Sequence, residues 1–531
     1  MSSPQLAISQ FNAGLMRPPS TRNRVERSFA LRTAAAGRDA FVPAAAQIDN
    51  GDEARYSDKC GTYTKDILQA GIGVVDLAAY ATFKKALDSG DPADFAAILV
   101  GGTRTLNDPQ GGLAFDLDCL DCSQFTAPPA PALASEDYAA ELVELYWASL
   151  LRDVAFTEYP GNATAVAAAN ELSSLPSYKG PRDASNKVTP QLLFRGGLAD
   201  GTFSGETVGP YMSQFLLQGT SMGAFAVDQK YTTFKAGIDY MLDPTTFLQV
   251  QNGISTGLQL QTGPPLYLHS GRGLAALTHS DVLYQEFLMA YLLLDSLNAP
   301  LNPGNPYNGS ATQNGFNTFG QPDIASTFAA VAREALNAVW FQKWYVHLRH
   351  RPESGGGIVY LNKTGQGNRV QGKPSNTVLN SQAVQSSFAK NSSYLLAQAF
   401  PEGSPTHPAY PTGHGTVAGA CITALKFFFD GSFVIPNPQV PSGDGTTLQN
   451  YTGADAGQMT VNGELHKLAH NVSFGHGIHA GIHWRSDTDS SIQLGEAVAL
   501  SVLRDRAHTY NEKFTVTLKK ADGSSATISN E

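Results

Sequence analysis

The chain has 531 residues and a formal net charge of −10, and 15% of its residues are charged, against roughly 25% in an average protein. The acidic balance argues against a nucleic-acid-binding protein, which would carry a basic face. No stretch reaches the roughly 18 uninterrupted apolar residues that a membrane span needs. Hydrophobic residues make up 42% of the chain, and so few charges on so long a chain favour a homo-oligomer that buries additional surface.

The N-terminus is basic. Residues 1–38 contain six arginines and a single acid, Glu26. This composition resembles a transit peptide and equally suits a basic arm that lies along an acidic neighbouring subunit, so we treat residues 1–45 as an extended N-terminal arm. No secretory signal opens the chain, which favours a cytoplasmic location. Four cysteines are too few for a disulfide framework, and Cys119 and Cys122 are predicted to be ordinary thiols or one local disulfide.

From Ala46 onward the hydrophobic pattern predicts helices joined by polar connectors. Ser135, followed by two acids, predicts the start of a helix whose apolar residues recur at helical spacing. An alanine-rich stretch and a stretch that is apolar on most sides predict two further helices, at 162–175 and 281–297.

A long loop over residues 298–325, rich in Asn, Pro and Gly, is the predicted boundary between two lobes. It separates an N-terminal helical lobe, residues 46–300, from a C-terminal helical lobe, residues 301–531. We expect the functional site in the second lobe, because the motifs described below lie there.

In the C-terminal lobe Ser326 is predicted to cap a helix that runs to about Arg349, since Pro352 disfavours helix at the residue before it. Gly355 and the polar residues as far as Ser386 predict a loop. Further helices are predicted over 415–429, 463–474 and 488–510, and alternating residues predict strands only in the tail, 513–527. The predicted fold class is therefore mainly α.

The stretch from Glu402 to Gly419 says most about function. It places His407 and His414 on either side of a Pro-Thr-Gly turn that leads into a helix of small residues. The N–H groups at a helix start, together with the Thr412 hydroxyl and an imidazole, form a seat for a tetrahedral oxyanion. The alternative is that His414 merely caps its helix.

Two further segments contain groups that suit an anion. In the first, Lys343 and Arg351 lie near the end of one helix, where the alternative role of the cations is to complement the helix dipole. In the second, His476 and His483 precede Asp487. Asp487 lies four residues after His483, so its carboxylate can accept the other ring N–H and fix the tautomer.

Together the three segments resemble the catalytic signature of the vanadium-dependent haloperoxidases, which share their fold and anion site with the type 2 phosphatidic acid phosphatases. That signature is a Lys, an Arg-Pro, a Ser-Gly-His turn and then Arg-x-x-x-Gly-x-His-x-x-x-Asp. The step from Lys343 to Arg351, and the extra His407 before His414, resemble the bromoperoxidase branch of red algae and cyanobacteria. Motifs near residues 50 and 112 and over 462–471 extend the resemblance along nearly the whole chain. It implies two helical bundles and a dimer or a dodecamer.

The resemblance also implies a cofactor, vanadate, with His483 as the ligand to the metal. Lys343, Arg351, the Thr412 hydroxyl and the Gly413 amide would neutralise the oxygens of the vanadate.

Roles in the reaction follow from the same resemblance. Hydrogen peroxide is activated with His414 as the acid–base group, and a halide attacks the activated oxygen. The product is a hypohalous-acid-like oxidant that halogenates small organic acceptors. His407 tunes the pocket near His414, a feature associated with bromide oxidation.

The chain departs from the family pattern at two positions. Thr412 stands where the family usually has Ser, and the hydroxyl is retained. Where the family has Arg, six residues before His483, this chain has Gly477, with His476 one place earlier. The segment is one residue longer than the algal pattern, so His476 is expected to take the place of the Arg. A charged hydrogen bond contributes roughly 1.5–3 kcal/mol, so we expect vanadate binding weaker by about tenfold or more. Arg485 also occurs in the algal pattern and is not an obvious replacement.

Three alternatives use the same residues. A phosphate-ester hydrolase would employ His483 as nucleophile and His414 as general acid. A zinc site would use His466 and His470, or the histidines at 476, 479 and 483. The third is a catalytically impaired, oligomeric anion-binding protein that has lost the family Arg.

Overall fold

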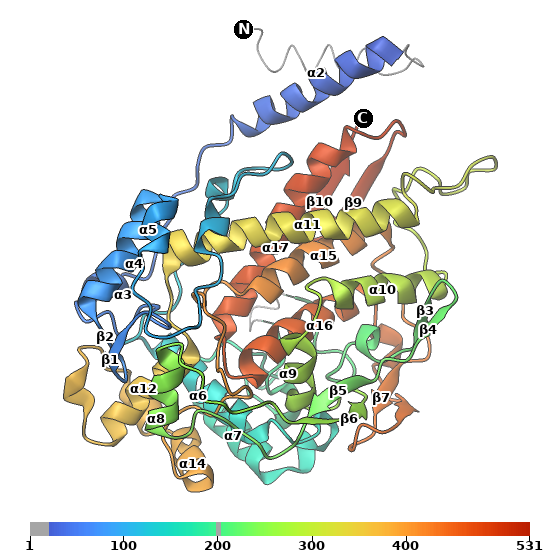
Figure 1. Ribbon diagram of the computed structural model, residues 1–531. Helices are drawn as coiled ribbons and strands as arrows, with labels where there is room; N and C mark the ends of the chain where they lie inside the picture. The colour runs from blue at the N-terminus through green and yellow to red at the C-terminus, as the bar shows by residue number, and fades with distance from the viewer. Residues whose placement is uncertain (1–20, 198–202) are drawn as a thin grey trace.

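The computed structural model describes residues 21–197 and 203–531, so the first part of the predicted arm lies outside the described residues. Most of the regular structure is helical (Figure 1). The helices are α2 (Thr21–Asp39), α3 (Asp52–Arg55), α4 (Leu77–Ser89), α5 (Pro92–Ala96), α6 (Glu136–Leu151), α7 (Ala163–Ser174), α8 (Pro244–Gln251), α9 (Gly271–His279), α10 (Gln285–Ser296), α11 (Gln321–Phe341), α12 (Pro352–Lys363), α13 (Asn376–Leu379), α14 (Gln382–Asn391), α15 (Gly413–Phe428), α16 (Val461–Phe474) and α17 (Arg485–Ala507).

The strands are short and pair into antiparallel two-stranded ribbons. The tail hairpin matches the predicted strands, whereas the other ribbons were not predicted, because two to five residues carry too little alternation to register. The ribbons are β1 (Gln69–Gly71) with β2 (Val74–Val75), β3 (Thr220–Met222) with β4 (Phe225–Val227), β5 (Tyr231–Phe234) with β6 (Thr262–Leu266), β7 (Gln439–Pro441) with β8 (Leu448–Asn450), and β9 (Thr515–Lys519) with β10 (Ser525–Ser529).

Helix α15 forms the centre of the C-terminal bundle. It packs against α11, α16 and α17, and α11 runs across this bundle in Figure 1. Almost all of its side chains are buried. Small residues set the spacing to α17: a Cβ added to Gly419 would lie 2.1 Å from the Ile492 carbonyl oxygen, and one on Gly495 would lie 1.9 Å from that of Thr416. This close approach places the start of α15 beside the start of α17, where the site lies.

The main core joins both predicted lobes. Its cluster of buried side chains runs from Tyr56 to Ile528 and includes residues of α6 and α7 as well as of α15–α17. The boundary near residue 300 therefore stays a prediction. Helices α6 and α7 begin where the sequence predicted, since Ser135 accepts a hydrogen bond from the Tyr138 N–H and Asn162 accepts from two N–H groups.

The predicted loop over residues 355–386 is wrong, because helices α12, α13 and part of α14 occupy it. The glycines there serve close packing inside a helix. A Cβ on Gly355 would lie 2.5 Å from the Tyr138 hydroxyl oxygen, and one on Gly356 would lie 2.7 Å from Leu396. Gly355–Gly357 therefore lets α12 approach its neighbours, whereas the sequence alone suggests a turn.

Two predicted element starts are also wrong. Helix α11 begins at Gln321 with Pro322 in its first turn, so Ser326 lies inside the helix and does not cap it. Helix α10 begins at Gln285, which leaves Asp281 in the preceding loop. Within the predicted N-terminal arm, residues 21–39 form the helix α2.

Two further observations concern membrane and thiol chemistry. Along residues 21–197 and 203–531, every helix is too short or too polar to cross a lipid bilayer. Cys119 and Cys122 are both free. Burial raises the pKa of both thiols, that of Cys122 to about 12, so neither is poised as a reactive thiolate.

Candidate active site

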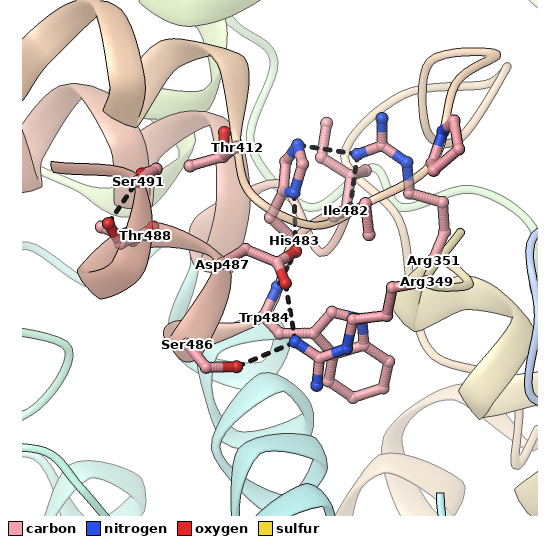
Figure 2. A network of polar contacts seen from close by, with 12 residues as sticks. Arg349, Arg351, Thr412, Ile482, His483, Trp484, Ser486, Asp487, Thr488 and Ser491 are labelled. Carbon is pink, nitrogen blue, oxygen red and sulfur yellow. Dashed lines mark hydrogen bonds and ion pairs between the residues drawn. The ribbon is translucent and has the colours of Figure 1, made fainter. Parts of the chain in front are cut away.

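His483 is the centre of a buried polar network at the start of α17 (Figure 2). Its Nδ1 donates to Asp487 Oδ2 over 2.8 Å, a pairing that leaves Nε2 with its lone pair. Asp487 also accepts from Arg349 Nη1 at 2.6 Å and from the Trp484 N–H at 3.1 Å. Three donors thus hold the carboxylate, and the carboxylate fixes both the ring orientation and the tautomer of His483.

Arg351 lies against the free nitrogen of this imidazole. Its Nη1 is 2.7 Å from His483 Nε2 and donates to the Ile482 carbonyl at 3.0 Å. Its Nε donates to the His407 carbonyl at 2.9 Å, and its Nη2 is 3.1 Å from Nδ1 of the same histidine. The His407 ring packs against the indole of Trp340, with ring centroids 4.9 Å apart. The guanidinium therefore links His407 to the unprotonated ring nitrogen of His483.

Lys343 supplies a second cation from the π-helical turn η6 (Gln342–His347), which continues α11. Its Nζ donates to the carbonyls of Pro408 and Ala409, at 2.9 and 2.8 Å. The side chain is completely buried. A buried ammonium whose direct partners, among residues 21–197 and 203–531, are neutral carbonyls strongly attracts an anion.

Thr412 is the N-cap of α15, and its side chain makes no capping hydrogen bond. Its hydroxyl is buried and has no hydrogen-bond partner among the described residues. The Thr412 N–H donates to the Asp487 carbonyl at 3.2 Å, which ties this turn to the start of α17. Figure 2 shows Thr412 beside the imidazole of His483. The hydroxyl and the first N–H groups of α15, from Gly413 on, thus form a candidate oxyanion-binding site.

His414 faces a carboxylate that the sequence did not assign to the site. Its Nε2 is 2.9 Å from Asp281 Oδ2 and 3.1 Å from Oδ1. On the other side, the His476 ring stacks on His414 with centroids 3.8 Å apart, and the His476 centroid lies 5.6 Å from that of His483. His476 Nδ1 is 3.2 Å from the Thr278 carbonyl oxygen.

The electrostatics of the pocket favour a bound anion. Burial and then the nearby Arg351 lower the pKa of Lys343 well below its usual value. Burial lowers the pKa of Arg351 to about 10. Burial, followed by Arg351 and Lys343, lowers the pKa of His483 well below its usual value. These groups repel one another, and a multiply charged oxyanion among them would relieve that repulsion.

The nine residues proposed from the sequence lie together. They are Lys343, Arg351, His407, Thr412, Gly413, His414, His476, His483 and Asp487, and each is linked to the next by the contacts above or by the chain itself.

The structure distinguishes the two candidates for the place of the family Arg. A Cβ on Gly477 would lie 3.0 Å from the Cβ of His483, so a side chain at this position would press on His483. His476 is the residue at the site. Arg485 is directed elsewhere, because it forms hydrogen bonds of 2.9 and 2.5 Å with the Glu144 carboxylate.

The histidines of the zinc alternative have other partners. His466 Nε2 lies 2.8 Å from Lys426 Nζ, and His479 Nε2 lies 2.8 Å from the Tyr211 hydroxyl. Within residues 21–197 and 203–531 no three His, Cys, Asp or Glu side chains are grouped so as to hold a metal ion.

Two functional residues escaped the sequence reasoning. Asp281 lies more than a hundred residues before His414, and its only signal is a lone acid ahead of an apolar helix. Arg349 lies between Lys343 and Arg351 in the sequence, but nothing in the sequence indicates its ion pairs with Asp487 at 2.6 Å and Glu141 at 2.8 Å.

A helical bundle with a buried cationic pocket around one oriented histidine defines an oxyanion-binding enzyme of the haloperoxidase class. A family model described as the VCPO second helical-bundle domain matches residues 324–512. These residues include the bundle of α11, α15, α16 and α17 and all nine proposed site residues.

Named relatives extend the match to nearly the whole chain. A vanadium-dependent bromoperoxidase from Corallina officinalis is 31% identical over 96% of this chain and 99% of its own length. One from Ascophyllum nodosum is 32% identical over 94% of this chain and 91% of its own length. The solved homohexameric structure of a second vanadate-dependent bromoperoxidase from Ascophyllum nodosum superposes with a TM-score of 0.90, at 28% identity, over 97% of this chain and 92% of the other. The chain belongs to the vanadium-dependent bromoperoxidase family.

Proposed function

We propose that this chain uses bound vanadate to oxidise bromide and iodide with hydrogen peroxide, and that the hypohalous-acid-like product halogenates small organic acceptors. The observation that carries the proposal is the buried contact of Arg351 with His483 Nε2, beside the Lys343 ammonium and the unpartnered Thr412 hydroxyl. Membership of the bromoperoxidase family supports the same reaction.

The donor set fits a tetrahedral oxyanion. His483 Nε2 would bind the vanadate, since Asp487 holds the proton on Nδ1. Lys343 and Arg351 would balance the charge of the oxygens, and the Thr412 hydroxyl would gain the partner that it lacks within the protein. Vanadate bound here supplies Lewis-acid activation of hydrogen peroxide without a change of oxidation state.

His414 and Asp281 form the acid–base pair. Asp281 accepts a hydrogen bond from His414 Nε2, so Nδ1 is the nitrogen that exchanges a proton with hydrogen peroxide. The carboxylate also stabilises the imidazolium that forms when the proton is taken. His407, held between Arg351 and Trp340, shapes the pocket on the other side and favours bromide.

The proposal includes assembly. The structural neighbour is described as a homohexamer, and the low content of charged residues suits a chain that buries part of its surface against copies of itself. We propose a homo-oligomer; the dimer and the dodecamer named above remain predictions of subunit number.

The experiment is a titration of the purified, oxyanion-free chain with orthovanadate. Bromination of a phenol red indicator is followed in hydrogen peroxide and bromide, with phosphate as the competing oxyanion. We expect saturable activation by vanadate, loss of that activation at high phosphate, and no activation in His483→Ala.

Two results contradict the proposal. Phosphate release from p-nitrophenyl phosphate in the absence of vanadate, without bromination, assigns the pocket to a phosphatase. Tight phosphate binding with no bromination at saturating vanadate assigns it to a non-catalytic anion-binding protein.

A further inference from the structure

We propose that one continuous surface, made by the exposed face of α2 and the loop over residues 113–118, is the contact between two copies of this chain. We name it the arm patch and define it by the apolar residues Val25, Phe29, Ala36, Leu113, Phe115 and Leu117. The proposal rests on the homo-oligomer proposed above and identifies the surface that forms it.

The first half of the arm patch is one side of α2. Val25, Phe29 and Ala36 recur at helical spacing and are all exposed, with Phe29 73% exposed. On the opposite side Ala34 is buried, and Arg38 pairs with Asp505 on the chain's own α17. In Figure 1, α2 lies outside the helical bundle. The helix is thus fixed to its own subunit by one side and presents an apolar side to the surroundings.

The second half is the loop that follows the 3-10 turn η1 (Pro109–Leu113). Phe115 is 85% exposed, Leu117 is fully exposed and Leu113 is partly exposed. Three large apolar side chains within five residues of an exposed loop are unusual on a monomeric protein, and they mark an interaction surface.

A single carboxylate joins the two halves. Asp505 Oδ1 binds the Arg38 guanidinium at the foot of α2, and Oδ2 accepts from the Cys119 N–H at 2.9 Å, at the end of the loop. The helix α2 and the exposed loop are therefore both anchored to one residue of α17, Asp505. They form one surface whose parts keep a fixed spacing.

The distribution of charge along the chain favours a second copy as the partner of the arm patch. Arg24 and Arg32 are exposed on α2, and Asp118 is exposed beside Leu117. The six arginines of residues 1–38 stand against one acid, so the net charge of −10 comes entirely from the rest of the chain. A positively charged arm is attracted to the negatively charged remainder of another copy.

A surface that carries both a basic apolar helix and an acidic apolar loop is complementary to itself. Related by a two-fold axis, α2 of one copy can lie on the loop of the other while the reciprocal contact forms at the same time. This self-complementarity favours a second copy over a different partner protein.

The test is sedimentation velocity of the full-length chain across a range of concentrations. The disrupting variant is the double substitution Phe29→Glu and Leu117→Glu, and the matched control is Phe225→Glu. Phe225 lies on β4, away from the arm patch, and is 66% exposed, close to the exposure of Phe29. We expect the mass of the assembly to fall at least twofold in the double variant and to stay unchanged in the control. Arg24→Glu with Arg32→Glu should weaken assembly more at low salt than at high salt.

Circular dichroism and vanadate-dependent bromination report whether each variant is folded, since the arm patch contains no site residue. A folded double variant with the wild-type mass overturns this inference and leaves the homo-oligomer standing. Equal dissociation by Phe225→Glu also overturns it. A wild-type monomer overturns the homo-oligomer as well. If in such a monomer hydrogen exchange of α2 and the loop is slowed only while residues 1–20 are present, the arm patch belongs to the chain's own N-terminus.

Discussion

Substituting His476 by arginine should tighten oxyanion binding. His476 already occupies the pocket, with its ring 3.8 Å from that of His414, and the family pattern has a guanidinium there. A charged hydrogen bond to the oxyanion contributes about 1.5–3 kcal/mol, and a neutral hydrogen bond from the imidazole that it replaces would contribute about 1 kcal/mol. The net gain is about 0.5–2 kcal/mol, or roughly 2- to 30-fold in Kd.

Gly477→Arg should have the opposite effect, although it restores the arginine at the family's distance from His483. Its Cβ alone would lie 3.0 Å from the Cβ of His483, so this residue, the proposed vanadate ligand, would have to give way by a few tenths of an ångström. We expect affinity weaker than wild type by about tenfold, because one well-placed ligand is lost.

The assay is calorimetric titration of the oxyanion-free proteins with orthovanadate and, separately, with phosphate. His476→Gln serves as the control, because it keeps a neutral polar side chain. The reasoning is refuted if His476→Arg binds no more tightly than His476→Gln, or if Gly477→Arg binds more tightly than wild type.

Three further outcomes are expected. Thr412→Val should weaken oxyanion affinity by about 2- to 12-fold without loss of folding free energy, because the hydroxyl has no partner within the described protein. Thr412→Ser retains a hydroxyl and should bind the oxyanion as tightly as wild type. Calorimetric titration measures the affinity, and urea unfolding measures the folding free energy. Asp281→Asn should lower kcat by about 10- to 100-fold through His414 while the vanadate Kd changes less than threefold, and an equal change in Kd would contradict the acid–base role. Glu334→Gln tests a pH effect, since burial and the neighbouring Asp116 raise the pKa of Glu334 to about 8. The folded state then holds its proton more tightly than the unfolded state, so this contribution is complete below about pH 4.5 and is lost as the pH rises to about 8. The variant should match wild type at pH 5 and exceed it by about 1–2 kcal/mol at pH 8.5, as measured by thermal unfolding at both values.

That the nine proposed residues lie together could be predicted from the sequence, because each lies in a short motif whose spacing reports local chemistry. His483 and Asp487 are four residues apart, and Thr412 and Gly413 open a helix, so each group carries its own local signal. The helical character of the fold was predictable for the same reason, since α6, α7 and α16 follow N-caps and periodic apolar residues.

The rest depends on long-range contacts that no local pattern reports. Asp281 reaches His414 only because α10 starts four residues later than its apolar stretch suggests. The glycines of α12 indicate a loop until Tyr138 and Leu396 are placed against them. The arm patch could not be predicted, because the sequence alone does not tell whether an apolar residue is exposed on a helix or loop or buried in a core.

The π-helical turn η9 (Gly475–His479) contains His476, the residue expected to take the place of the family arginine. A π turn accommodates one residue more than an α turn while the helix on either side stays in place. The one additional residue expected in this segment can therefore be accommodated within the turn, while α16 before it stays in place. A single codon gained or lost at this turn can exchange which side chain faces the oxyanion without disturbing the ligand itself.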